Sequence, residues 1–347
     1  MRELLNLTLC ELEEWMRAND QPRFRAKQLY SWVISGTPFE EMHNLPKALR
    51  ERLAEEWVVN PVEIREAYRS RLDETEKYLY KLPDGNLIEG VLMRYHHGDT
   101  LCLSTQVGCR MGCRFCASTL EGCVRNLTPG EMLGQIVAVN RRLREADRRV
   151  HNVVLMGSGE PLDNYENTVR FLRLLNAPEG LNLSLRNVSL STCGLVPRML
   201  QFAKEGLAVT LSISLHAPND EVRKRLMPVA NAYPIREVVA ALRNYVEKTG
   251  RRVIVEYALV KGVNCAPGQA DELAALLKGL ICHVNLIPLN AVAERDLCPP
   301  DRREVEAFQH RLEHRGLSAT IRREMGADIQ GACGQLRRSV LQAESHA

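Results

Sequence analysis

Three cysteines in one short segment have the clearest chemical potential. Cys109 and Cys113 are separated by three residues, and two residues separate Cys113 from Cys116. Three thiolates at this spacing can ligate three irons of a 4Fe–4S cluster and leave the fourth iron without a protein ligand. Such an iron can bind a substrate or cofactor directly. The alternative is zinc, which prefers four protein ligands, and Cys123 stands close enough in the sequence to complete that set.

Glycines and polar residues that follow short apolar segments form a second group of candidates. In the turn MGSGEP, Gly159 permits a close approach of the backbone to a ligand, and the carboxylate of Glu160 can accept hydrogen bonds from an ammonium group. Ser191 and the run 214–216 end the next two apolar segments, where hydroxyl and imidazole groups can bind a carboxylate or a ribose. Each also has an ordinary structural explanation as a turn or a helix cap.

Another cysteine, Cys333, lies near the C-terminus in the sequence GADIQGACGQL. Its small neighbours allow the thiol to be presented to a reactive centre. A buried, inert thiol explains the pattern equally simply and is favoured by the residues alone.

The helices and strands that position these residues can be predicted from the hydrophobic pattern, which changes near residue 100. From there on, helical segments alternate with short apolar, β-branched segments at LCLSTQV, NVVLMG, RNVSLST, VTLSISL, VIVEYALV and HVNLIPL. About six strand–helix repeats predict an α/β fold, with a parallel sheet and helices outside. This number of repeats fits a curved partial (β/α)6 barrel better than a flat doubly wound sheet, although periodicity alone does not distinguish the two. Ligands of such folds gather at the C-terminal ends of the strands. The cysteine loop, the MGSGEP turn and Asn290 are therefore expected at one mouth.

The first part of the chain has a different pattern. Residues 24–34 and 45–57 show helical apolar spacing, and residues 76–95 contain two β-rich runs joined by the turn sequence PDGN. We therefore expect four parts: a helical accessory domain (1–60), a β-hairpin connector (61–95), the barrel (96–325) and a C-terminal tail that carries Cys333 (326–347).

Composition excludes several classes of protein. The chain has 347 residues, of which 45% are apolar and 26% charged, and this is enough apolar material to exclude bulk disorder. No apolar run approaches the roughly 18–20 residues of a membrane span, and the N-terminal segment lacks a secretory pattern. We therefore expect a cytoplasmic protein, in which the 11 cysteines are mostly reduced thiols.

Charge is distributed unevenly. Residues 1–90 carry 13 basic and 17 acidic side chains, whereas residues 110–150 hold eight arginines and four acidic residues. A basic face on the larger domain suits a polyanionic partner, although on charge alone a solvated helix surface is the simpler explanation.

The cysteine spacing, with Phe115 directly before the last cysteine, resembles the signature of the radical S-adenosylmethionine (SAM) superfamily. Longer stretches resemble one family of it, the RlmN/Cfr adenosine methyltransferases. They cover nearly the whole chain: FRAKQLYSW, LCLSTQVGCRMGCRFC, RNLT, MGSGEPLDNYENT, LRNVSLSTCGLVP, SLHAPND, VNLIPLN and ACGQL. The resemblance implies methylation of an adenine ring carbon in 23S rRNA, with tRNA as a further substrate in some relatives.

Carbon 2 is the expected target, because the motifs are similar to the RlmN branch; carbon 8, the Cfr-type target, is the nearest alternative. A radical SAM activase acting on protein would share the cysteine loop but would not need Cys102 and Cys333. An electron-transfer or zinc protein would bind metal without cleaving SAM.

The resemblance also implies residue roles. One 4Fe–4S cluster is held by Cys109, Cys113 and Cys116. SAM is bound by Gly159, Glu160, Ser191, Ser214, Leu215, His216 and Asn290.

The family's catalytic roles fall on three further residues. Cys333 takes a methyl group from one SAM, and a second SAM yields the radical that removes hydrogen from that methyl group. Cys102 takes the proton from the adenine carbon and then attacks the sulfur of Cys333, releasing the product and forming a transient disulfide. Glu89 is an acid/base candidate.

The implied partners are 23S rRNA, tRNA and a reducing electron donor such as flavodoxin or ferredoxin, acting on a monomer. Phosphate contacts are expected from basic residues of the larger domain and from a local patch near the N-terminus. These are Arg125, Arg141, Arg142, Arg144, Arg148 and Arg149, with Arg23, Arg25 and Lys27.

Overall fold

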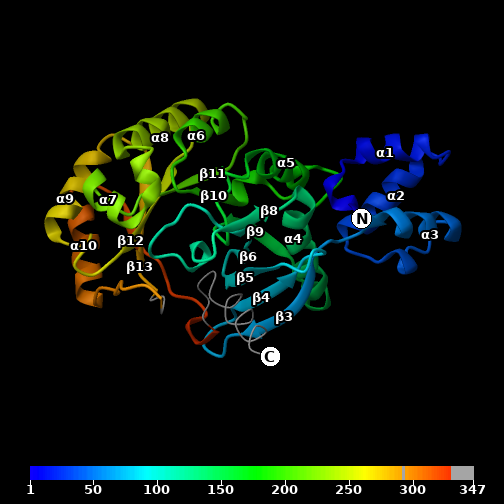
Figure 1. Ribbon diagram of the computed structural model, residues 1–347, viewed down its shortest axis with the longest axis horizontal. Helices are drawn as coiled ribbons and strands as arrows, with labels where there is room; N and C mark the ends of the chain where they lie inside the picture. The colour runs from blue at the N-terminus through cyan, green and yellow to red at the C-terminus, as the bar shows by residue number, and fades with distance from the viewer. Residues whose placement is uncertain (291–293, 330–347) are drawn as a thin grey trace.

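The computed structural model describes residues 1–290 and 294–329, and Figure 1 shows their arrangement. One mixed sheet of ten strands forms the centre. Its order is β14 (Ala319–Ile321), β13 (Cys282–Pro288), β12 (Val253–Leu259), β11 (Thr210–Ser214), β10 (Val188–Thr192), β9 (Val150–Leu155), β6 (Gly98–Cys102), β5 (Leu87–Tyr95), β4 (Glu76–Lys81) and β3 (Glu63–Arg69). Neighbours from β6 to β14 are parallel, and those from β3 to β6 are antiparallel. The predicted α/β fold with a parallel sheet is confirmed.

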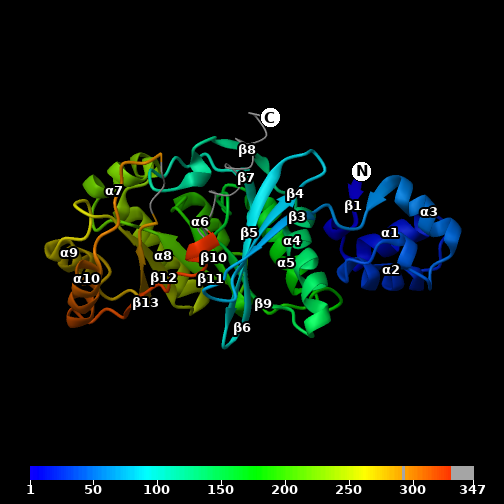
Figure 2. The same ribbon diagram turned by 90° about the horizontal axis from the view of Figure 1, so that it is seen from below.

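Helices cover the outside of the parallel strands (Figures 1 and 2). They are α4 (Pro129–Leu143), α5 (Tyr165–Asn176), α6 (Val196–Phe202), α7 (Asp220–Leu226), α8 (Ile235–Thr249), α9 (Pro267–Leu276) and α10 (Arg302–His314). Their apolar faces pack on the sheet, and local sequence fixes their ends. For example, Thr128 and Glu131 form a capping box at the start of α4, and α8 stops at Gly250, which adopts a left-handed conformation.

The two faces of the parallel sheet differ in chemistry. Residues paired across neighbouring strands share a face, and alternate residues of one strand point to opposite faces. One face carries fully buried apolar side chains such as Leu190, Leu211 and Val255. The other face runs from Cys102 through Val154 and five polar residues on the following strands, Ser189, Ser191, Ser214, Glu256 and Asn285. The inner face is therefore polar and suited to a polar ligand.

The N-terminal helices form a lobe at the right of Figure 1. They are α1 (Leu9–Ala18), α2 (Phe24–Ile34) and α3 (Lys47–Glu56), and the short strands β1 (Arg2–Glu3) and β2 (Trp57–Val58) pair beside them. The helices expected at 24–34 and 45–57 correspond to α2 and α3. Buried residues of this lobe, including Leu29 and Leu53, belong to the same hydrophobic core as the barrel.

The hairpin expected at 76–95 is present as β4 and β5, which pair antiparallel around the PDGN turn. Strand β5 pairs with β6, and β3 extends the same sheet, so the strands of residues 61–95 are continuous with the barrel sheet. Among the described helices, none has the length and apolar character needed to span a bilayer.

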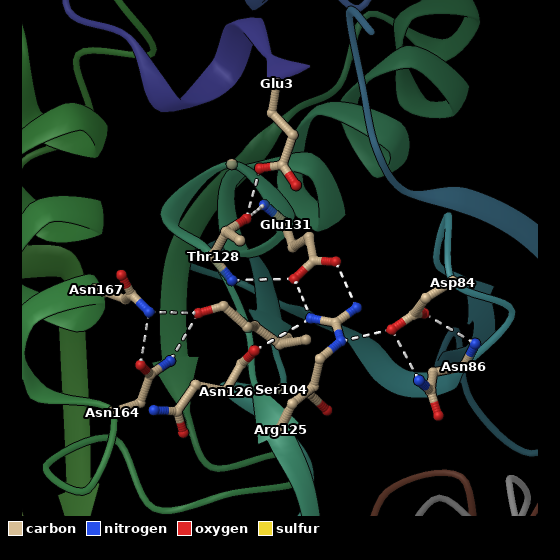
Figure 3. Close-up of polar contacts among 12 residues, drawn as sticks. Glu3, Asp84, Asn86, Ser104, Arg125, Asn126, Thr128, Glu131, Asn164 and Asn167 are labelled. Atoms are coloured by element: carbon tan, nitrogen blue, oxygen red, sulfur yellow. Dashed lines mark hydrogen bonds and ion pairs between the residues drawn. The ribbon is translucent and has the colours of Figure 1, made fainter. Parts of the chain in front are cut away.

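A polar junction joins the N-terminal lobe, the hairpin turn and the barrel (Figure 3). Arg125, on the short strand β8 (Cys123–Asn126), donates to Asp84 at 2.6 Å and, with two nitrogens, to the buried carboxylate of Glu131 at 2.8 Å each. Glu131 also accepts from the amide of Thr128, whose hydroxyl donates to Glu3 at 2.5 Å. Arg125 holds the pKa of Asp84 down to about 2.

Replacing Arg125 with alanine is expected to lower the free energy of unfolding by about 3 kcal/mol, because it leaves Glu131 buried without its cation. Urea denaturation followed by circular dichroism measures this loss. Arg198→Ala breaks an exposed pair with Glu166 and is the matched control, expected to cost less than about 1 kcal/mol. Equal effects of the two substitutions would contradict the prediction.

Candidate active site

A cavity of about 260 Å³ opens at the C-terminal ends of the parallel strands. All the predicted cluster and SAM ligands except Leu215 line it: Cys109, Cys113, Cys116, Gly159, Glu160, Ser191, Ser214, His216 and Asn290. Leu215 is fully buried, and its amide donates to the carbonyl of Glu256 at 3.1 Å. The structure therefore brings together residues that are up to 181 positions apart in the chain.

The cysteine loop is held at both ends by backbone contacts. It leaves the short strand β7 (Gln106–Gly108) and returns through β8. Gly108 has a φ of +76°, and a Cβ at this position would collide with the carbonyl oxygen of Gly122. The amide of Cys109 donates to that same oxygen at 2.8 Å, and the hydroxyl of Thr119 donates to the carbonyls of Cys113 and Cys116. These bonds close the loop around the mouth of the cavity.

The chemistry of the three thiols fits an iron–sulfur cluster. Burial raises the pKa of Cys109 to about 12 and also raises that of Cys113, so the thiolate forms need a bound cationic group at neutral pH. Within residues 1–290 and 294–329, no three His, Cys, Asp or Glu side chains converge as ligands of a single metal ion. Three cysteines spread around one cavity suit a cluster in which each binds a different iron. Cys123, the fourth ligand required for zinc, is not among the residues that line the cavity.

Glu160 is fixed at the wall of the cavity. Its two carboxylate oxygens accept from the amides of Cys193 at 2.7 Å and Leu162 at 3.0 Å, so it links the ends of β9 and β10. Burial raises its pKa, and these hydrogen bonds oppose the shift. The neighbouring Gly159 has a φ of +110°, and a Cβ there would stand 2.6 Å from the hydroxyl of Thr105. The turn therefore requires glycine and presents an oriented carboxylate.

His216 is a buried, neutral imidazole. Its Nδ1 accepts from the amide of Ala258 at 2.8 Å, which leaves the proton on Nε2. The ring packs edge-on against Phe115 with 4.7 Å between centroids. Burial, followed by the positive charge of Arg223, lowers its pKa to about 3. His216 is therefore a hydrogen-bond donor, and not a cation, at the cavity wall.

This low pKa predicts a pH dependence of stability. The unfolded chain binds a proton at His216 below about pH 6.5, whereas the folded chain does so only near pH 3, so stability is full above pH 6.5 and falls as the pH falls. Between pH 7.5 and 5.5, wild type should lose about 1.4 kcal/mol more than His216→Gln. Urea denaturation of both proteins at the two pH values measures this difference, and equal losses would refute it.

The predicted catalytic residues Glu89 and Cys102 lie on the neighbouring antiparallel part of the sheet. Both are buried, and both lie on the same face, because Cys102 pairs with Val91, two residues beyond Glu89 on β5. Glu89 forms a buried ion pair with Lys77 of β4 at 3.1 Å. Cys333 lies outside the described residues. The ten cysteines within those residues form no disulfide.

The sequence analysis missed several buried charged groups. Glu256 interrupts the apolar run VIVEYALV, and a single charge inside a buried strand is a signal that identifies such residues. Lys77 follows Glu76 at the start of its strand, so the sequence gives no such signal for its burial. Glu256 accepts from Asn285 at 2.9 Å and lines the cavity together with Arg322. Arg223, which lies beneath the cysteine loop, was also missed.

Several arginines expected to contact RNA also have intramolecular partners. Arg125 belongs to the junction described above, and Arg148 pairs with Asp99. Arg141 and Arg142 lie within 3.8 Å of carboxylates, and Arg144 donates to a backbone carbonyl. Part of the positive charge of residues 110–150 is therefore paired within the protein, and the RNA contacts stay a prediction.

The parallel sheet, the three-cysteine loop and the cavity that they enclose define a radical SAM enzyme. Residues 103–277 match the family described as "Radical SAM superfamily", and residues 2–59 match "Ribosomal RNA large subunit methyltransferase N-terminal domain". The crystal structure of a radical SAM methyltransferase from Sphaerobacter thermophilus superposes with a TM-score of 0.94 at 46% identity, covering 96% of this chain and 99% of that one.

Relatives that align over the full length of the chain identify its family. The chain is 51% identical over 345 residues to the "Probable dual-specificity RNA methyltransferase RlmN" of Clostridium botulinum, covering 99% of each sequence. The protein of the same description from Lachnospira eligens is 51% identical over 347 residues, covering 99% of this chain and 97% of that one. The chain belongs to the RlmN family.

Proposed function

We propose that this chain methylates carbon 2 of an adenine in 23S rRNA and an adenine in tRNA, using two SAM molecules per product. One observation carries the proposal: in this chain, which is similar over its full length to RlmN proteins, the three cysteines and the residues expected to bind SAM line one cavity. The relatives' description as dual-specificity RNA methyltransferases supports two kinds of RNA substrate. Their RlmN assignment favours carbon 2 over the Cfr-type carbon 8.

The cavity provides matched groups for the cofactors. Cys109, Cys113 and Cys116 would hold a 4Fe–4S cluster, which supplies the electron that cleaves SAM. Glu160 would accept a hydrogen bond from the ammonium group of SAM, beside the tight turn that Gly159 makes possible. The groups that would bind the ribose and carboxylate are the hydroxyls of Ser191 and Ser214, the Nε2–H of His216, the backbone at Leu215 and the amide of Asn290.

The protein's own residues then transfer the methyl group. The sulfur of Cys333 attacks the methyl carbon of SAM, the sulfonium C–S bond breaks, and the thiol proton is lost to solvent. A radical that a second SAM would supply takes a hydrogen atom from this methyl group, and the resulting carbon radical adds to the adenine ring. The adenine carbon is electrophilic and has no lone pair to attack a sulfonium, so tethering a reactive methylene beside it removes the obstacle.

Release of the product requires a base and a second thiol. Cys102 removes the proton from the adenine carbon, and the adduct loses its unpaired electron, for which the bound cluster would be the acceptor. After releasing that proton, the Cys102 thiolate attacks the sulfur of Cys333, the S–C bond breaks, the methylene carbon takes up a proton to become the methyl group, and a transient disulfide forms. Glu89, paired with Lys77 on the same face of the sheet, would exchange protons with the substrate. We further propose a cytoplasmic monomer, reduced by flavodoxin or ferredoxin, with an accessory domain at 1–60.

The segment before residue 330 is anchored to the β3–β4 turn. The carboxylate of Asp328 accepts from the hydroxyl of Ser70 at 2.6 Å and from the amide of Arg71 at 2.8 Å. The amide of Gly326 donates to Asp73 at 3.0 Å. These bonds fix the point from which the chain leads, five residues later, to Cys333.

Asp328→Ala is therefore expected to slow methylation of Cys333 about tenfold by loosening this attachment. Single-turnover reactions, sampled by peptide mass spectrometry, give the rate. Ser70→Ala removes only the hydrogen bond from the Ser70 hydroxyl to Asp328, so it should slow methylation of Cys333 by a smaller factor. Unchanged rates in both variants would show that the anchor does not position the carrier.

The proposed function is tested by the mass of the peptide that contains Cys333. Protein is expressed with iron, purified without oxygen and incubated with SAM. One added methyl group on the cysteine supports the carrier mechanism. An unmodified thiol in cluster-loaded protein would overturn it and favour an activase that acts on protein.

A further inference from the structure

Arg223 of α7 is a fully buried guanidinium. Arginine is rarely buried completely unless an acidic partner compensates its charge. Here the hydrogen-bond partners within the described residues are two backbone carbonyls: one nitrogen donates to Cys193 at 2.6 Å and another to Tyr233 at 3.2 Å. The Nε–H is buried and has no hydrogen-bond partner there. The fold therefore keeps a buried positive charge without a hydrogen-bonded carboxylate at this point, at a cost in desolvation.

The cysteine loop lies directly against this helix. The amide of Arg114, next to Cys113, donates to the carbonyl of Leu226 at 2.9 Å. A Cβ on Gly112 would stand 3.3 Å from Pro228, in the turn that follows α7. Cys113 and Leu226 also share a small buried cluster of apolar side chains. Arg223 is close enough to Cys113 to interact electrostatically with its thiolate.

A positive charge beside a 4Fe–4S cluster affects its two oxidation states differently. An oxidised 4Fe–4S core carries two positive charges, and three thiolates bring the site to −1. One-electron reduction takes it to −2. A fixed positive charge in a poorly screened interior stabilises the more negative state. Two carboxylates oppose this effect: Glu160, at the cavity wall, and Asp220, one turn before Arg223 on α7.

We propose that Arg223 raises the reduction potential of the cluster and so favours its one-electron reduction by the donor. The proposal rests on the proposed function, in which the three cysteines bind a 4Fe–4S cluster. Arg223 is a positioning residue in this sense: it acts on the cluster through the electric field and through its bond to the Cys193 carbonyl, without touching the reacting atoms.

The test is a redox titration of the reconstituted full-length protein with dithionite, followed by electron paramagnetic resonance, without SAM. Arg223→Gln should make reduction about tenfold less favourable, a shift of 59 mV to lower potential for one electron. Arg223→Lys keeps the charge and should remain closer to wild type. Arg225→Gln removes the same charge from an exposed position of the same helix, where water screens it, and should leave the potential unchanged.

Asp220→Asn gives an independent measurement on a variant that retains Arg223. It neutralises an opposing carboxylate and keeps the oxygen that accepts from Ile235, so the potential should rise. The potential of Asp220→Asn can be measured even if Arg223→Gln does not retain iron. Potentials equal to wild type in iron-loaded Arg223→Gln, or in Asp220→Asn, would overturn the inference. Failure of the wild type itself to bind a cluster would instead overturn the proposed function.

Discussion

Cys113→Ala is expected to reduce RNA methylation by more than about a thousandfold, because the cluster loses one of its three protein ligands and the electron source is lost with it. The iron content of reconstituted protein should fall from about four atoms per chain to less than one. Anaerobic reconstitution with iron and sulfide, followed by iron analysis and a SAM cleavage assay, measures both effects. The side chain is buried at the wall of the cavity, and alanine occupies less space, so the fold should persist.

Cys123→Ala is the matched control for this experiment. Cys123 lies on β8 beside the loop but does not line the cavity. A cluster with three protein ligands does not need it, so iron content and methylation should remain at wild-type levels. A four-ligand zinc site would lose its metal in both variants. Loss of metal from Cys123→Ala would therefore contradict the cluster assignment.

The fold was predictable where apolar periodicity is strong. Helix α2 has the predicted bounds, Phe24–Ile34, and the six apolar segments from 101 to 289 all contain barrel strands. Two strands of the sheet were missed for different physical reasons. The sequence of β3, EIREAYR, is mostly polar because much of the strand is exposed, and β14 has only three residues, too few for a periodic signal.

The candidate site was predictable where its residues lie in local motifs at strand ends. Cys109 and Glu160 are examples, since both belong to short, unusual sequences. Contacts between distant segments were not predictable. The pairing of Lys77 with Glu89 depends on the register of β4 and β5, and the placement of Arg223 depends on how α7 packs under the loop. Likewise, the intramolecular partners of Arg125 lie 41 and six positions away, so its charge alone suggested a nucleic-acid contact instead.

Cys102→Ala is expected to stop product release while leaving the earlier steps intact. In the proposed mechanism, the RNA is joined to Cys333 through the transferred carbon until a second thiol breaks the S–C bond. Cys102 is buried on the polar face of the sheet and is replaced by a smaller side chain, so iron binding and methylation of Cys333 should persist. Turnover should fall by more than about a thousandfold. A covalent protein–RNA adduct should accumulate and be visible as a shifted band on a denaturing gel.

The double variant Cys102→Ala/Cys333→Ala separates this mechanism from simpler ones. Without Cys333 there is no carrier, so the adduct should disappear, although the cluster site is unchanged. If Cys102 only supported the fold, its replacement would lower stability without trapping RNA, and no adduct would form in either protein. Cys102 and Cys333 are 231 positions apart in the sequence. An adduct that requires Cys333 and accumulates only when Cys102 is absent would show that both thiols act on the same substrate atom. Normal turnover by Cys102→Ala would rule out its role in release.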